Sequence, residues 1–105
     1  MTALELFLER LATRNQLGAV VVSDKKGRVV SGVGLMVDLR DLGKLGSDVA
    51  SGRSVDGEFQ RVTGGDDLYV RELAVGEQSY VLSSLGGRVR RIADATDAIG
   101  RILAA

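Results

Sequence analysis

The 105-residue sequence contains no cysteine, histidine, proline or tryptophan. Without cysteine the chain forms no disulfide and no thiolate-ligated zinc or iron–sulfur site. Without histidine as well, the Ser-His-Asp and Cys-His arrangements of common hydrolases cannot be assembled. These absences exclude many classes of enzyme, and we predict no catalytic residue, no metal site and no cofactor.

The chain also lacks an excess of either charge, because 14 lysines and arginines balance 14 aspartates and glutamates. Nucleic-acid-binding proteins normally carry a basic excess, so we expect no nucleic-acid partner. The longest apolar stretch, Leu17 to Val22, is far shorter than the ~20 residues of a membrane span. Because Glu5 and Glu9 interrupt the N-terminal segment, it does not resemble a secretory signal. We therefore expect a cytoplasmic protein without a membrane span, with residues 1–105 forming a single domain.

The first third of the sequence predicts a helix followed by a β-hairpin. Thr2 is a helix N-cap, and apolar residues then recur at helical spacing through about Arg14. The apolar run Ala19–Ser23 predicts a strand that is covered on both faces. Residues 24–27 have turn chemistry, so residues 28–33 are expected to return as the second strand.

Asp38 is the predicted N-cap of a second helix that ends near Gly52. Two glycines, Gly43 and Gly46, lie inside this helix, where each costs about 1 kcal/mol relative to alanine. Such residues are tolerated where another backbone comes close. The expected buried stripe of this helix consists of Leu35, Leu39, Leu42, Gly46 and Val49.

The rest of the chain predicts three strands and a last helix. The strands are expected at about 58–63, 68–73 and 78–85, and the helix follows Gly86 and Gly87 and extends to Leu103. The predicted order is α-β-β-α-β-β-β-α. This order is an α+β sandwich, with a five-stranded antiparallel sheet and helices on both faces.

Three short patterns imitate catalytic motifs but lack the residues that the chemistry requires. Ser23 and Lys26 have Ser-x-x-Lys spacing, but they straddle a hairpin turn instead of facing each other on a helix. Gly43-Lys44 lacks the first glycine and the final Ser or Thr of a phosphate loop. Residues 64–68 resemble the signature of diguanylate cyclases, but such domains are longer and need acidic ligands on an earlier strand. We interpret residues 64–67 as a turn.

The element order resembles the roadblock (dynein light chain) family, which has a profilin-like fold. The resemblance covers essentially the whole chain, and its most telling parts are the apolar first strand and tight hairpin of residues 18–30. The short middle helix, the segment 58–85 and the closing helix complete it. The chain is closest in style to the bacterial and archaeal members that partner small Ras-like GTPases of the gliding-motility type.

This resemblance implies a homodimer, or a heterodimer with a related subunit, in which the third strand pairs with its mate and the two middle helices lie side by side. The poorly defended strand edge at residues 59–62 supports this interpretation. The implied dimer interface is formed by Leu39, Leu42, Gly43, Gly46, Phe59, Gln60, Arg61 and Val62.

The resemblance also implies that the middle-helix pair binds a GTPase and regulates it or acts as a scaffold. Leu45 is predicted to be exposed on the helix face opposite the buried stripe. We therefore predict a contact patch for the GTPase that consists of Leu45 ringed by Arg40, Asp41, Lys44 and Asp48.

Two alternatives to GTPase binding stay open. Profilin-like sheets also serve as small-molecule sensors, for which Tyr69, Tyr80, Ser79 and Ser83 are the available core polar residues. The second alternative is a purely structural dimerisation subunit. A basic cluster of Arg88, Arg90 and Arg91 near the last helix is either a solvated surface or a contact for an acidic partner.

Overall fold

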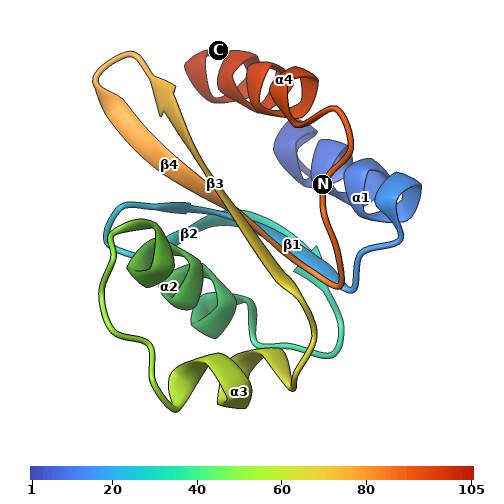
Figure 1. Ribbon diagram of the computed structural model, residues 1–105. Coiled ribbons are helices and arrows are strands. Elements are labelled where there is room, and N and C mark those ends of the chain that lie inside the picture. Colours follow the sequence, from blue (N-terminus) through green and yellow to red (C-terminus); the bar gives the residue numbers. More distant parts are fainter.

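The computed structural model describes all residues from Met1 to Ala105 and contains four helices and four strands (Figure 1). The elements follow one another as α1 (Ala3–Asn15), β1 (Ala19–Asp24), β2 (Val29–Gly34), α2 (Leu39–Ala50), α3 (Glu58–Thr63), β3 (Leu68–Val75), β4 (Gln78–Leu85) and α4 (Ile92–Ala104).

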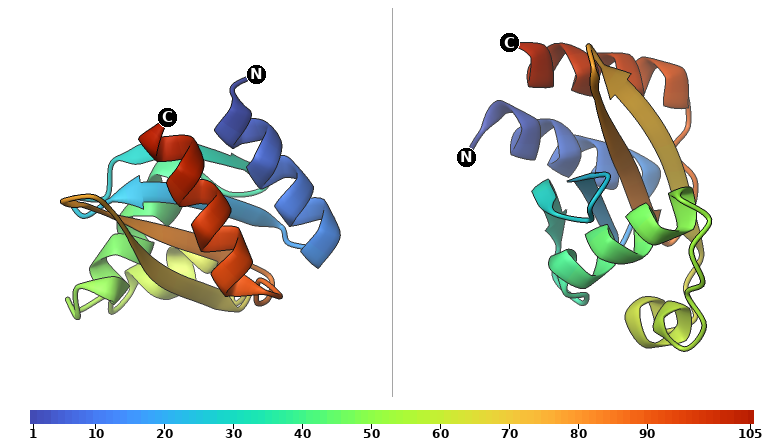
Figure 2. Two further views of the ribbon diagram at one scale, coloured as in Figure 1. Left: turned by 90° about the horizontal axis from the view of Figure 1, so that it is seen from above. Right: turned by 90° about the vertical axis from the view of Figure 1, so that its left-hand side faces the viewer.

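The strands form one antiparallel sheet in the order β2-β1-β4-β3. Helices cover both of its faces, with α1 and α4 side by side on one face and α2 on the other (Figure 2). The predicted α+β architecture and its helix-covered faces are confirmed, but the sheet has four strands instead of five. The outer edges of β2 and β3 pair with no other strand.

The alternating side chains of β1 divide the core in two. Val20 and Val22 pack with α1 and α4, whereas Ala19 and Val21 pack beneath α2. This placement confirms that the apolar first strand is buried on both faces, and it explains why the strand has no polar alternation.

The predicted strand at 58–63 is wrong, because this segment is the short helix α3. Gly57 and Gly64 flank it with φ values of 82° and 63°, a conformation that favours glycine and turns the chain at both ends. Within α3, Glu58 and Arg61 form an ion pair at helical i,i+3 spacing, and Val62 is buried against the core below α2. The helix therefore directs Val62 into the core and keeps the charged side chains of Glu58 and Arg61 at the surface.

Candidate functional site

Helix α2 begins at Asp38, whose carboxylate accepts hydrogen bonds from the backbone N–H groups of Arg40 (2.9 Å) and Asp41 (3.3 Å). This contact confirms the predicted N-cap, which satisfies two of the free amides at the start of the helix. The negative charges of Asp38 and Asp41 also lie at the positive end of the helix dipole.

The two glycines of α2 face the sheet of the same chain. A β-carbon on Gly43 would lie 2.9 Å from Cγ2 of Val29, and one on Gly46 would overlap the hydroxyl of Ser83. The nearest neighbours of these glycines are side chains of the sheet beneath them, so the glycines face this chain's own sheet and do not lie open to a second middle helix.

Two buried serines fix the rotation of α2 on the sheet. The Ser47 hydroxyl donates to the carbonyl of Asp24 at 2.7 Å, and the Ser23 hydroxyl lies 3.2 Å from the carbonyl of Gly43. The two hydroxyls are 2.9 Å apart. Because both serines are buried, their hydrogen bonds hold α2 in one orientation.

The predicted buried stripe of α2 is confirmed at Leu42 and Gly46 and is wrong at Leu35 and Val49. The residues that are buried are Leu42, Gly43, Leu45, Gly46 and Ser47. Leu35 lies outside the helix and is 96% exposed, and Val49 is 38% exposed. The glycines and Ser47 permit the closest contact with the sheet, so they take the inward side, and the leucines on either side fill the space.

Leu45 is only 3% exposed and packs with Val62 and Leu85, so the predicted exposed leucine is wrong. Helix α3 covers this side of α2. Leu45 forms the apolar base below a ring of charged side chains.

That ring forms what we call the α2–α3 surface, a shallow pocket of about 280 Å³. Its lining residues are Asp41, Lys44, Leu45, Asp48, Glu58 and Arg61. The structure thus brings together four of the five residues predicted to contact the GTPase, while Arg40 is exposed outside the pocket.

Arg61 connects the two helices of this surface. Its guanidinium donates to Asp41 of α2 at 3.2 Å and to Glu58 of α3, with Nε at 3.2 Å from Oε1. The hydrogen bonds that Arg61 donates to Glu58 and then to Asp41 raise the pKa of Arg61 above its ordinary value, and the bond that Glu58 accepts from Arg61 lowers the pKa of Glu58. These side chains are more than 40% exposed, so the ion pairs orient the surface and add little stability.

Asp48 is the second centre of charge pairing on the α2–α3 surface. It accepts from Arg53 at 2.7 Å and lies 3.5 Å from Nζ of Lys44. Sequence reasoning missed Glu58 and Arg53, since both lie in a stretch that it assigned to a strand or a loop. The i,i+3 spacing of Glu58 and Arg61 was the available signal for a helix.

The predicted dimer-interface residues separate into two groups. Leu42, Gly43, Gly46 and Val62 are buried within this chain. Leu39 is half-buried, and Phe59, Gln60 and Arg61 are exposed. Strand pairing through residues 59–62 is absent from this fold because the segment is helical.

No group of three or more acidic residues is placed to hold a metal ion. None of the helices is long and apolar enough to cross a membrane.

Neither a protein-family model nor a curated protein sequence matches the chain. Solved structures match its fold. MglB of Myxococcus xanthus has a TM-score of 0.66 and 21% sequence identity, with 98% of this chain and 96% of that chain covered. The gliding protein MglB of Thermus thermophilus has a TM-score of 0.56 and 13% identity, covering 94% and 84% of the two chains.

A Roadblock/LC7 domain from Streptomyces avermitilis also matches, with a TM-score of 0.54 and 21% identity over 94% of this chain and 90% of that one. The roadblock resemblance predicted from the sequence is therefore confirmed at the level of the fold.

Proposed function

We propose that this chain, which has the fold of MglB and Roadblock/LC7 domains, is a non-enzymatic cytoplasmic module that forms a homodimer and binds a small Ras-like GTPase. The observation that carries the proposal is the match to MglB over 98% of the chain. The GTPase partner follows from the roadblock resemblance. A regulator of this kind prefers the GTP-bound form, because the γ-phosphate orders the switch loops that it contacts.

The α2–α3 surface is the part of the chain that we propose for GTPase binding. It carries both signs of charge, with Lys44 and Arg61 beside the carboxylates of Asp41, Asp48 and Glu58. Mixed exposed charges set the orientation and the association rate of a partner more than they add affinity. Leu45 supports this surface from below, and direct contact falls to the charged side chains.

Titration calorimetry with a gliding-motility-type GTPase, loaded with a GTP analogue or with GDP, tests this proposal. We expect Lys44→Glu and Arg61→Glu each to weaken binding of the GTP form by at least about tenfold. The matched control is Arg101→Glu on α4, which makes the same charge change on the opposite face of the sheet. Equal losses from all three variants would contradict a specific surface. Equal affinity for the two nucleotide forms would indicate a scaffold instead of a regulator.

For the homodimer, we propose contact through the free edge of β3 together with the exposed side of α3. An unpaired strand edge offers backbone donors and acceptors to a second chain. Phe59 of α3 is 40% exposed and precedes this edge in the chain. In this arrangement Leu42, Gly43, Gly46 and Val62 do not contact the partner, and they pack in the core beneath the interface.

Sedimentation velocity tests the dimer. We expect Phe59→Glu to raise the dimer dissociation constant by at least about tenfold, since it introduces a charge into a desolvated contact. The control is Val30→Glu on β2, the opposite edge of the sheet, where the replaced valine is 45% exposed. If Val30→Glu dissociates the dimer and Phe59→Glu does not, the β2 edge is the interface.

A further inference from the structure

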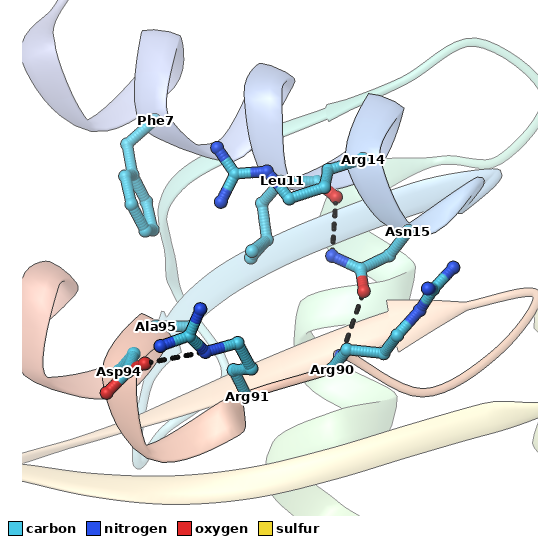
Figure 3. A pocket seen from close by; sticks show the side chains of 8 residues that line it. All are labelled: Phe7, Leu11, Arg14, Asn15, Arg90, Arg91, Asp94 and Ala95. Carbon is cyan, nitrogen blue, oxygen red and sulfur yellow. Dashed lines mark hydrogen bonds and ion pairs between the residues drawn. The ribbon is translucent and has the colours of Figure 1, made fainter.

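The face of the sheet opposite the α2–α3 surface carries a pocket of about 370 Å³ between α1 and α4 (Figure 3). Its apolar part consists of Phe7 and Leu11 of α1 and Ala95 of α4. Leu11 and Ala95 are buried members of the core, so this part of the pocket has a fixed shape. The volume lies at the lower end of the ~300–1,000 Å³ typical of small-molecule sites.

Charge in this pocket is strongly unbalanced. Arg14, Arg90 and Arg91 line it together with a single carboxylate, Asp94, which gives three positive charges, one negative charge and a net charge of +2. The whole chain has a net charge of zero. Asp94 pairs with Arg91 at 3.0 Å, but none of the ion pairs of the structure includes Arg14 or Arg90.

A hydrogen-bonded asparagine fixes the two sides of the pocket relative to each other. The amide of Asn15 donates to the carbonyl of Leu11 at 2.9 Å, and its oxygen accepts from the backbone N–H of Arg90 at 2.8 Å. This contact ties the loop before α4 to the end of α1. Because Arg91 follows Arg90 and Arg14 precedes Asn15, the same contact fixes the backbone positions of Arg14 and Arg91 relative to each other.

The side chains of Arg14 and Arg91 extend from opposite sides into the space between Phe7 and Ala95, whereas Arg90 extends away beyond Asn15 (Figure 3). A guanidinium group presents a planar fork of donors that matches the two oxygens of a carboxylate. The pocket therefore suits a ligand in which a carboxylate is attached to a hydrophobic group. The two guanidinium groups would contact the carboxylate, and the apolar base would contact the hydrophobic group.

We propose that the α1–α4 pocket binds a small organic carboxylate with an aromatic or branched apolar body. The carboxylate lies between Arg14 and Arg91, where Arg14 supplies the uncompensated charge. The apolar body packs on Phe7 and Leu11. This site does not depend on the proposed GTPase binding, since it lies on the other face of the sheet. It also differs from the sensor site considered from the sequence, because none of Tyr69, Tyr80, Ser79 and Ser83 lines it.

NMR titration of the ¹⁵N-labelled chain with phenylacetate tests the proposal, with phenylacetamide as the neutral analogue and acetate as the analogue without an apolar body. We expect phenylacetate to shift the amide signals of Leu11, Asn15 and Ala95, with a Kd on the order of 1 mM. Phenylacetamide and acetate are expected to bind at least about fivefold more weakly, because phenylacetamide lacks the carboxylate and acetate lacks the apolar ring.

Substitutions of single arginines test whether phenylacetate binds in this pocket. Arg14→Gln and Arg91→Gln should each weaken phenylacetate binding at least about fivefold, since each removes one guanidinium. Arg88→Gln removes an exposed arginine from the same loop but outside the pocket, and it should leave the Kd unchanged. Dispersed amide spectra of all three variants would show that they keep their fold.

Equal binding of phenylacetate and phenylacetamide, or unchanged binding in Arg14→Gln and Arg91→Gln, would overturn the proposal. If phenylacetate causes no shifts but a peptide ending in Glu-Phe does, the occupant is a protein segment and the small-ligand proposal is wrong.

Discussion

Gly46 of α2 lies directly over Ser83 of β4, and a β-carbon on Gly46 would overlap the serine hydroxyl and lie 2.9 Å from its Cβ. The Ser83 hydroxyl is buried without a hydrogen-bond partner. This contact sets how closely the helix that carries Asp41, Lys44 and Asp48 approaches the sheet.

We expect Gly46→Ala to lower the free energy of unfolding by roughly 1–3 kcal/mol, because overpacking at a closed contact outweighs the gain in helix propensity. Chemical denaturation measures this change. Gly100→Ala in α4 is the control, since the nearest atom to a new β-carbon there is 3.9 Å away. That variant should be neutral or more stable by up to about 1 kcal/mol. Adding Ser83→Gly to Gly46→Ala should restore part of the loss. If it restores nothing, the Ser83 contact is not the cause.

Leu45 provides a second test of how α2 is oriented. Because its side chain is 3% exposed, Leu45→Ala should cost about 2–5 kcal/mol in unfolding free energy, and Leu45→Asp should cost more. Val49→Ala on the exposed side of the same helix should cost much less. Thermal and urea unfolding measure all three variants. A stable, folded Leu45→Asp variant would mean that Leu45 lies on the surface, as the sequence alone suggested.

The N-cap of α2 provides a third test. We expect Asp38→Ala to destabilise the chain by about 1 kcal/mol, because it removes the acceptor for two backbone N–H groups. Asp38→Ser keeps a capping oxygen and should retain most of the stability. Urea denaturation of the three chains is the measurement. Equal losses from serine and alanine would indicate that the charge of Asp38, and not its hydrogen bonds, stabilises the helix.

Local signals in the sequence predicted the elements that depend on local chemistry. Thr2 and Asp38 cap helices as expected, since each side chain accepts from nearby backbone N–H groups. The apolar run Ala19–Ser23 correctly indicated a strand buried on both faces.

Helix α3, the side of α2 that faces the sheet and the α1–α4 pocket depend instead on interactions between segments that are distant in the sequence. The two apolar side chains of residues 58–63, Phe59 and Val62, have the i,i+3 spacing of a helix, but the segment is too short for that spacing to decide its structure, and burial of Val62 beneath α2 is a tertiary contact. Which side of α2 faces the sheet depends on Ser47, because its hydroxyl donates to the backbone carbonyl of Asp24, 23 residues earlier in the chain. The α1–α4 pocket combines Arg14 with Arg91, which no local pattern connects.

The β1–β2 turn has a pH-dependent stability that can be tested at Asp24. Burial raises the pKa of this carboxyl, but hydrogen bonds from the backbone and side chain of Arg28 and from the Lys26 N–H outweigh it, so the pKa lies below the ordinary value of 3.8. Folding therefore favours the charged form. This stabilisation is complete above the unfolded-state pKa and is lost as the pH falls below about 4 through the folded-state pKa.

We expect Asp24→Asn to be less stable than the parent chain at pH 7, because the amide keeps an acceptor for the turn but loses the 2.9 Å ion pair with Arg28. The difference should shrink as the pH falls below about 4, where protonation removes the same charge from the parent chain. Unfolding free energies of both chains between neutral and acidic pH measure this. Asp56→Asn is the control, since Asp56 is exposed and forms no side-chain hydrogen bond or ion pair. A difference between parent and Asp24→Asn that stays constant down to the lowest pH would show that the charge of Asp24 does not stabilise the turn.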